Sequence, residues 1–366
     1  RGYPVGTCRT SSVSPELGVT YEGYTLRDLV DLPVEDVVYL LLNKELPAAG
    51  AAEALKAEFA GRSAIDPRVY DGLRALPKDG HPMEWLIAGL SLLGMTGKSP
   101  DNDYREDCLN LIARISTLVA AIYRIREGWG DPIEPRHDLP FHENFAHMLG
   151  LENAPPVLSE LLRLFYVLHM DHGGGNLSTF VGKAIASSKS DMYSSIAGAM
   201  AALYGPRHGR ANQECLAFVK SIGTADPEKA EARVRDILAS GGLVFGFGHA
   251  VLRQEDPRAD IQYAFGQKHF ADDELVKTAL TLRRVVPAIL KENPKIQNPY
   301  PNVDAISGSL LTAAGLTDPE YYTMLFGWSR VAGIAVQILD ERTFPGKKDG
   351  LPIYRPKYVA RNQPPK

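Results

Sequence analysis

The feature that most constrains this fold is a helical spacing of apolar residues through most of the chain. One window places five of them on a single helical face: Leu275, Ala279, Leu282, Val286 and Ile289. Apolar residues at three- and four-residue spacing are typical of helices that bury one side. The alternation typical of strands is confined to residues 10–13 and 19–21, around a turn at 15–18. We therefore expect an all-α protein with one minor β-hairpin near the N-terminus.

Capping residues locate two helix starts and one helix end. Asp226-Pro227 and Asp318-Pro319 each join a carboxylate that can cap a helix to a proline suited to its first turn. Gly241-Gly242 would end the first of these helices, because glycine accepts the left-handed backbone of a helix terminus.

The segment after Glu341 is rich in proline and glycine, which exclude a long helix. We expect it to be an extended arm. Because it carries Arg355, Lys357 and Tyr358, it is a candidate for reaching across a subunit interface.

Length and charge bound the class of protein. The 366 residues allow two ordinary domains or one large one, and no repeat or linker separates them, so two domains would be packed or interleaved. Lys and Arg number 40 against 44 Asp and Glu, a net charge of −4, which argues against general binding of nucleic acid or an anionic membrane. Apolar runs such as residues 332–339 are shorter than the roughly eighteen residues that span a bilayer.

Three further patterns point away from familiar sites. The three cysteines, Cys8, Cys108 and Cys215, are distant from one another in sequence. This spacing favours neither a disulfide framework nor a zinc site, and it indicates a reducing compartment. Gly97-Lys98-Ser99 lacks the glycine of a phosphate loop, and Gly246-Phe247-Gly248 lacks the third glycine of a dinucleotide fingerprint. His169 and His172 could be a metal pair, but the glycines at 173–175 favour the end of a helix, so we expect no metal.

A histidine between glycines, His208, stands just before a helix that continues through Cys215. We expect the partial positive charge of that helix end, with Arg207 and Arg210, to lower its pKa and keep it neutral. A neutral imidazole can donate a hydrogen bond to a carbonyl and stabilise a developing enolate. A histidine that is simply satisfied within a tight turn remains the other interpretation.

Two later segments add similar chemistry. His249 is a second glycine-flanked histidine, followed by Arg253 and Arg258, and the pattern predicts an anion-binding loop. Asp304 stands at the start of an apolar helix over 305–314, where it is either a functional carboxylate or only a helix cap.

Together and in this order, these segments resemble the citrate synthase family. Six motifs carry the resemblance: Leu168-His169-Met170-Asp171-His172, Gly205-Pro206-Arg207-His208-Gly209, Gly246-Phe247-Gly248-His249, Asp256-Pro257-Arg258, Pro301-Asn302-Val303-Asp304 and Phe326-Gly327-Trp328-Ser329-Arg330. The resemblance runs from Arg1 to Lys357. It implies a homodimer whose subunits have a large helical domain, residues 1–209 plus 309–366, and an inserted small helical domain, residues 210–308.

The resemblance also implies a reaction, the condensation of acetyl-CoA with oxaloacetate followed by hydrolysis of citryl-CoA to citrate and CoA. Asp304 would take a proton from the acetyl methyl group, and His208 would polarise the thioester carbonyl. His249 would hydrogen-bond the oxaloacetate carbonyl and protonate the forming alkoxide. Acetyl-CoA would be a cosubstrate, with no permanently bound cofactor.

Binding residues follow from the same resemblance. The positions that match oxaloacetate and citrate ligands are His172, Arg258, Arg330 and, from across the dimer interface, Arg355. The positions that match the CoA site are Leu243, Val244, Gly246, Gly248 and Arg253. The sequence departs from the family pattern at Gly173, where Glu is frequent, at Arg207 and Arg210, and at Gln297, where animal relatives carry a CoA-binding Lys.

Several alternatives stay open at this stage. A 2-methylcitrate synthase using propionyl-CoA and a citryl-CoA lyase would share these motifs, and a non-catalytic helical scaffold is the remote alternative. Because residue 1 is Arg rather than Met, we expect the native start to be missing, and the sequence leaves targeting open. We expect a bacterial cytoplasmic protein, with the mitochondrial matrix as the alternative.

Overall fold

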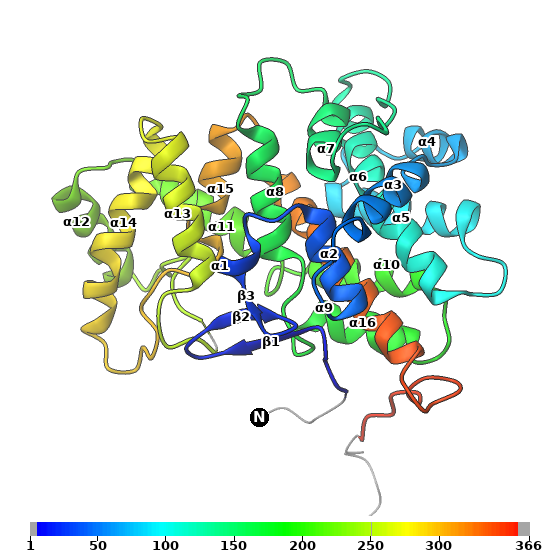
Figure 1. The fold of residues 1–366 in the computed structure, drawn as a ribbon. Coiled ribbons are helices and arrows are strands. Elements are labelled where there is room, and N and C mark those ends of the chain that lie inside the picture. The colour runs from blue at the N-terminus through cyan, green and yellow to red at the C-terminus, as the bar shows by residue number, and fades with distance from the viewer. Residues whose placement is uncertain (1–5, 250, 358–366) are drawn as a thin grey trace, which may run out of the picture.

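The computed structural model describes residues 6–249 and 251–357. Helices dominate this part of the chain, as the apolar spacing predicts (Figure 1). The first group comprises α1 (Leu26–Leu29), α2 (Val34–Asn43), α3 (Ala51–Arg62), α4 (Pro67–Arg74), α5 (Pro82–Gly97), α6 (Tyr104–Glu127), α7 (Phe141–Leu149), α8 (Leu158–His169), α9 (Leu177–Ala186) and α10 (Met192–Leu203). The second comprises α11 (Ala211–Ile222), α12 (Pro227–Ala239), α13 (Pro257–His269), α14 (Glu274–Lys291), α15 (Asp304–Ala313), a 3₁₀ turn η1 (Pro319–Tyr321) and α16 (Tyr322–Arg342).

A small antiparallel sheet lies beside the helices. Strands β1 (Ser11–Ser14) and β2 (Gly18–Tyr21) form the predicted hairpin, with Val13 opposite Val19. A third strand, β3 (Tyr24–Thr25), pairs with β2. The sequence does not predict β3, because two residues are too few for an alternating pattern.

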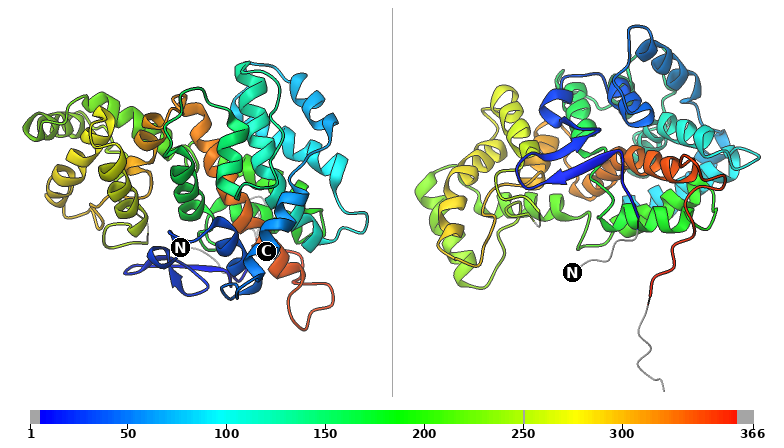
Figure 2. Two further views of the ribbon diagram at one scale, coloured as in Figure 1. Left: turned by 45° about the horizontal axis from the view of Figure 1, so that its top comes forward. Right: turned by 60° about the horizontal axis from the view of Figure 1, so that its bottom comes forward.

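Helices α11–α15 pack mainly on one another and lie to one side of the molecule, while α3–α7 and α10 lie on the other (Figure 1). Helix α16 extends between them, in contact with α6, α8, α9, α10 and α11. Beyond α16 the chain has no helix or strand up to residue 357 and runs away from the helical body (Figure 2). The arm predicted for this segment is confirmed over the described residues.

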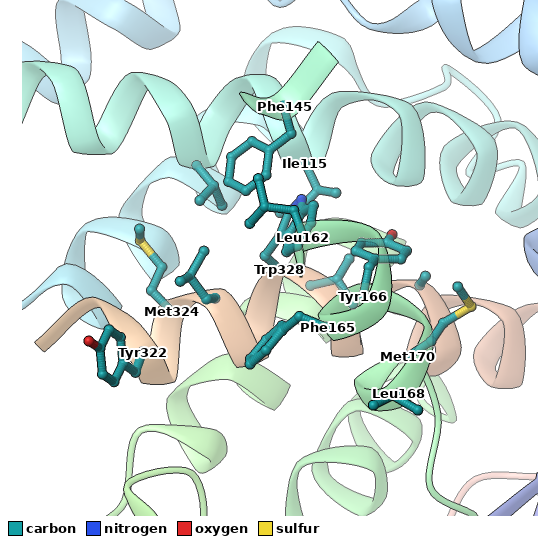
Figure 3. Packing of buried hydrophobic residues seen from close by; sticks show 14 of the residues in the cluster. Ile115, Phe145, Leu162, Phe165, Tyr166, Leu168, Met170, Tyr322, Met324 and Trp328 are labelled. Atoms are coloured by element: carbon teal, nitrogen blue, oxygen red, sulfur yellow. The ribbon is translucent and has the colours of Figure 1, made fainter. Parts of the chain in front are cut away.

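The core surrounds Trp328 of α16, which is fully buried and labelled in Figure 3. Its ring centroid lies 4.3 Å from that of Phe145 and 4.6 Å from that of Tyr166. Its indole nitrogen donates to Ser116 Oγ at 2.9 Å, so the polar atom is satisfied inside the apolar cluster. Aromatic packing therefore fixes the middle of α16 against α6, α7 and α8.

Helix α6 is long and apolar enough to cross a membrane by composition alone, unlike the shorter apolar runs considered in the sequence. However, 94% of its most apolar window is buried inside the fold. A core helix meets the same criterion, so this single helix is weak support for a membrane span.

Most of the predicted caps are confirmed. Asp226 accepts from Lys229 N at 3.0 Å and starts α12, and Gly241, with φ of 78°, follows its end. Asp318 caps a turn, but that turn is η1, and the α-helix begins only at Tyr322. The expectation of an α-helix from Pro319 is wrong in this detail because the first turn takes the tighter 3₁₀ form common at helix ends.

Gly333 lets α16 approach the chain that follows α8. A Cβ on Gly333 would lie 2.7 Å from Asp171 Cβ and would also collide with the carbonyl oxygen of Met170. The same close approach lets Arg330 Nε donate to the carbonyl oxygen of His169 at 2.8 Å. The contact between these two segments therefore requires a residue without a side chain.

Replacing Gly333 by Ala should lower the free energy of unfolding by about 1–3 kcal/mol or more, because the methyl group overpacks a filled interface. Gly61→Ala is the matched control, since this helical glycine has nothing within 4 Å of an added Cβ and alanine favours a helix. Thermal unfolding of both variants measures the difference. A Gly333→Ala midpoint equal to that of the unsubstituted protein would contradict the close approach.

Candidate active site

Six of the predicted site residues come together where α8, α15, α16 and the loop before α13 meet. The His172 and His249 ring centroids are 5.9 Å apart, although the residues are far apart in sequence. The charge of Arg330 helps to lower the pKa of His172 and of His208, and it opposes a rise in the pKa of Asp304. Arg258 acts in the same direction on His172 and His249. The folded chain thus groups three imidazoles, one carboxyl and two guanidinium groups.

The hydrogen bonds of His249 define which ring nitrogen carries its proton. Its Nδ1 faces the backbone N–H groups of Val251 and Leu252 at 3.1 and 3.0 Å, and it must accept from both. Burial, with Arg258, lowers its pKa, so the ring is neutral at neutral pH. The proton is therefore on Nε2, which makes that atom a hydrogen-bond donor.

His208 has the opposite tautomer. Its Nε2 accepts from the backbone N–H of Ser178 at 3.1 Å, so the neutral ring carries its proton on Nδ1. Burial lowers its pKa to about 4, with a further contribution from Arg330. The prediction of a neutral imidazole agrees with this direction. The predicted cause is wrong, because the ring meets the first turn of α9 rather than of α11, and the arginine that acts on it is Arg330 rather than Arg207 or Arg210.

Asp304 is the first residue of α15, but it is not the cap of that helix. The cap position is Val303, which has no capping side chain, and the backbone N–H of Asp304 donates to Asn302 Oδ1 at 3.0 Å. No residue in the described part of the chain donates a hydrogen bond to the Asp304 carboxyl group. Burial raises its pKa to about 6, while Arg258 opposes the rise. A half-buried carboxyl group left unpaired near neutral pH has the properties of a general base.

Arg258 is buried, with 3% of its surface exposed, and forms a two-pronged ion pair with fully buried Asp256. Its Nε and Nη2 donate to the Asp256 carboxylate at 3.0 and 2.7 Å. Burial alone would raise the pKa of Asp256, but Arg258 and its hydrogen bonds hold it below the ordinary value. No local pattern indicates Asp256 as this partner, since an aspartate before a proline is typical of a helix cap.

Arg330 is also buried, with 2% exposed, yet it forms no ion pair with a carboxylate of the described residues. One nitrogen donates to the carbonyl oxygen of His169, and the guanidinium lies 4.7 Å over the Phe326 ring. Burial lowers its pKa to about 10. A buried cation without an anionic partner is costly, so the site is built to receive a negatively charged ligand.

His172 follows fully buried Asp171, whose side chain also helps to shape the site. The backbone N–H of His172 donates to Asp171 Oδ1 at 2.7 Å. Burial, with Arg258 and Arg330, holds the pKa of His172 well below its ordinary value. The Nδ1 of His169 is bonded to the carbonyl oxygen of Phe165 at 2.8 Å, and its ring stacks on Phe165. The described residues contain no group of three or more His, Cys, Asp or Glu side chains that could hold a metal.

The predicted CoA residues lie beside this cluster. Leu243 is 68% exposed, and Arg253 is exposed, with its backbone N–H donating to the carbonyl oxygen of Pro15 at 3.3 Å. Gly246, with φ of 80°, lies where a Cβ would be 2.8 Å from Ala305 Cα. The absence of a side chain at Gly246 therefore allows the loop to pack on the helix that carries Asp304. This contact with α15 requires glycine at position 246, whereas the sequence suggested that the glycines let the backbone approach a ligand.

Arg355 is the one predicted substrate ligand that a single chain does not bring to the cluster. It is exposed in the arm, next to Tyr354. Tyr354 is anchored at the end of α16, where its hydroxyl donates to Glu341 Oε1 at 2.6 Å.

Comparison with known proteins identifies the family. The family model described as "Citrate synthase, C-terminal domain" matches residues 1–357. The chain belongs to the citrate synthase family. Citrate synthase 4, mitochondrial, of Arabidopsis thaliana is 38% identical over 96% of this chain and 78% of its own length. The mitochondrial citrate synthase of Saccharomyces cerevisiae is 36% identical over 95% of this chain and 77% of its own length.

Solved citrate synthases share the fold. The Thermotoga maritima enzyme superposes with a TM-score of 0.83 at 29% identity, covering 100% of this chain and 96% of that one. The Thermoplasma acidophilum enzyme, solved as a ternary complex with carboxymethyl coenzyme A and oxaloacetate, gives 0.85 at 25% identity, covering 99% and 96%. Fold and family are therefore established together.

Within the citrate synthase family, the four unusual positions of this chain lie in different settings. Gly173 has φ of 64°, so a glutamate there would be strained. Arg207 and Gln297 are exposed, whereas Arg210 is half-buried and its Nε faces Gln213 Oε1 at 3.3 Å. No contact of these four changes the set of imidazole, carboxyl and guanidinium groups described above.

Replacing Asp304 by Asn should stabilise the fold at neutral pH. Because the folded-state pKa lies above the ordinary value, the ionised carboxylate destabilises the fold once the pH exceeds about 6, and this cost vanishes in acid. The thermal midpoint of Asp304→Asn should exceed that of the unsubstituted protein at about pH 8 and match it at about pH 4. An advantage of equal size at both pH values would mean that ionisation of Asp304 is not its source.

Proposed function

We propose that this member of the citrate synthase family condenses acetyl-CoA with oxaloacetate and hydrolyses citryl-CoA to citrate and CoA, the first committed step of the tricarboxylic acid cycle. The observation that carries the proposal is Arg330, a buried cation with no carboxylate partner among residues 6–249 and 251–357. It lies beside a carboxyl group of raised pKa and two imidazoles of opposite tautomer. A dicarboxylate would supply the missing anion, and the other groups would supply proton transfer.

In the first step, Asp304 takes a proton from the methyl group of acetyl-CoA. A carboxylate is a weak base for such a proton unless the enolate is stabilised as it forms. The Nδ1–H of His208 donates to the thioester oxygen, on which negative charge develops. With a pKa of about 4, the His208 ring is neutral at working pH. A neutral imidazole can stabilise the developing enolate through this hydrogen bond. The half-buried setting of Asp304 raises its proton affinity and so favours the transfer.

In the second step, the enolate carbon attacks the oxaloacetate carbonyl. The Nε2–H of His249 donates to that carbonyl oxygen and passes its proton to the alkoxide. The ring then regains a proton as Asp304 releases the one it took from the methyl group, which returns both residues to their starting states. The two backbone N–H groups on Nδ1 orient the ring for this role. Citryl-CoA is then hydrolysed by water, which releases citrate and CoA.

Oxaloacetate is bound by Arg258, Arg330 and His172, and Arg355 of the partner subunit completes the set. Arginine pairs with carboxylates through two parallel hydrogen bonds, which offsets the cost of burying the charge. CoA binds along the 243–248 loop and Arg253, and no cofactor is bound permanently. The Thermoplasma acidophilum complex, with carboxymethyl coenzyme A and oxaloacetate, supports this substrate pair.

We propose a homodimer in which residues 210–308 form a small domain inserted into the large one, residues 1–209 plus 309–366. Closure of the small domain over oxaloacetate would exclude water before the enolate forms. Packing of α11–α15 mainly on one another supports a small domain, although α15 continues to Ala313, past the boundary at 308. The names of the curated relatives support the mitochondrial matrix over the bacterial cytoplasm expected from the sequence.

The related reactions differ in substrate or direction. A 2-methylcitrate synthase would prefer propionyl-CoA, and one methylene group changes binding by only about 1–3 kcal/mol. The ratio of kcat/KM for acetyl-CoA and propionyl-CoA separates these two activities. Incubation with citryl-CoA separates the lyase, which would give oxaloacetate and acetyl-CoA rather than citrate.

The protein should release thiol from acetyl-CoA only when oxaloacetate is present. Asp304→Ala should lower kcat by about 100-fold or more, because it removes the base. In the unsubstituted enzyme, kcat/KM should fall about tenfold per pH unit below about pH 6, since only ionised Asp304 accepts a proton. An Asp304→Ala variant that condenses the substrates at the normal rate would overturn the mechanism.

Crossing of the arm is tested by mixing two inactive variants. Arg355→Ala has an intact Asp304, and Asp304→Ala has an intact Arg355, so a mixed dimer contains one complete site if the arm crosses. Unfolding and refolding them together at equal amounts should restore about a quarter of the unsubstituted activity, because half of the dimers are mixed and each has one working site. If Arg355 acts within its own subunit, the mixture stays as inactive as its components.

A further inference from the structure

A chain of polar contacts connects the C-terminal arm to Asp171, the residue before His172 of the candidate active site. It starts at Tyr354, whose hydroxyl donates to Glu341 Oε1 at 2.6 Å. The same oxygen lies 3.0 Å from Lys183 Nζ of α9. Lys183 Nζ in turn faces Gln337 Oε1 at 3.3 Å, and Gln337 Nε2 donates to Asp171 Oδ1 at 2.8 Å.

The middle of this chain is shielded from water. Lys183, Gln337 and Glu341 are each no more than 3% exposed, and Asp171 is fully buried. Burying a lysine and a glutamate costs several kcal/mol per ion unless each finds good partners. Lys183 also donates to the carbonyl oxygen of Thr7 at 2.7 Å, so its charge is well satisfied. None of these four residues is among the groups to which the proposed chemistry assigns a task.

Lys183 determines which way the Gln337 amide points. An ammonium group can only donate, so the amide oxygen must face it. The NH₂ group is then directed to Asp171 Oδ1 and to the carbonyl oxygen of Gly173 at 3.2 Å. With the amide reversed, an oxygen would face the carboxylate and the carbonyl, which repel it.

At its other end, this chain of polar contacts reaches the residues on either side of His172. Asp171 accepts the backbone N–H of His172, and Gly173 follows it directly. Thr10 fixes the other carboxylate oxygen of Asp171 at 2.6 Å. Asp171 is also the acidic group that most opposes the fall in the pKa of Arg330. The orientation of Gln337 thereby sets the position of the segment that carries His172.

We propose that Lys183 and Gln337 are positioning residues that couple docking of the arm at Glu341 to the geometry of the oxaloacetate site in the same subunit. This rests on the proposed function, in which the arm also carries Arg355 to the site of the partner subunit. Each arm then acts in two places. It supplies a ligand to one site and, through Tyr354, Glu341, Lys183 and Gln337, holds His172 in the other.

The experiment uses dimers with one working site and the conservative change Tyr354→Phe, which removes only the hydroxyl group at the start of the chain. In the first dimer, the subunit with the working site carries Tyr354→Phe, and its partner carries Asp304→Ala. In the second, the working subunit is unsubstituted, and the partner carries both changes. Differently tagged subunits allow each mixed dimer to be purified.

The KM for oxaloacetate should rise by about threefold to tenfold in the first dimer, the effect of losing one hydrogen bond, and should stay unchanged in the second. A rise in this KM confined to the second dimer would mean that Tyr354 only places Arg355. No rise in the KM of either dimer would mean that the polar contacts have no effect on the oxaloacetate site. Either result would overturn the proposal. If the unsubstituted enzyme fails to condense acetyl-CoA with oxaloacetate, it is the proposed function that fails.

Two further variants separate positioning from a general loss of structure. Gln337→Met cuts the chain without leaving a charge unpaired, and Tyr354→Phe should then have no additional effect on the KM for oxaloacetate. Effects that simply multiply would contradict coupling through Gln337. Tyr104→Phe is the matched control, because its hydroxyl donates to the carbonyl oxygen of Ser190 at 2.8 Å and has no link to the site. It should leave the KM unchanged.

Discussion

The guanidinium group of Arg330 lies inside the protein without a carboxylate of the described chain as its ion-pair partner. Burial of such a charge is tolerated only where other interactions hold the surroundings in place. The carbonyl oxygen of His169 and the ring of Phe326 give partial compensation, and the remaining deficit favours a negatively charged ligand. The same positive charge helps to keep His172 and His208 neutral. Arg330 therefore adds to the effect of burial, which is the larger cause of the neutral state of both imidazoles.

Helix α16 makes this possible because it is anchored along its whole length. Aromatic packing around Trp328 fixes its middle, and Gly333 brings it against the segment that follows α8. One helix therefore carries the core tryptophan, the buried Arg330 and two members of the polar chain to the arm, Gln337 and Glu341. A shift of α16 would disturb the core, the surroundings of Arg330 and the contact with the arm together.

The sequence allowed much of this to be predicted, and its errors have physical causes. Helical spacing, the hairpin and the caps at Asp226 and Gly241 depend on residues near one another in sequence, and these predictions hold. The neutral state of His208 was predicted from the helix that follows it, whereas the structure assigns it to burial, Arg330 and the N–H of Ser178. Those partners are distant in sequence, and no local pattern indicates them. The alternative interpretation of Asp304 as a cap is wrong because Val303 occupies the cap position and Asp304 is already the first residue of α15.

By itself, the sequence determined the helical class, the motif residues and, through resemblance, the family, because local periodicity and motif identity are properties of short segments. Only the tertiary structure decided which carboxyl group is paired and which is left unpaired. Asp256 meets Arg258, while Asp304 stays without a hydrogen-bond donor in the described chain, although both are aspartates at helix starts. Their pKa values move in opposite directions, because desolvation and neighbouring charges depend on what packs around a residue. The same packing joins Lys183 to Asp171 through Gln337, a connection that appears only once α9 and α16 lie together.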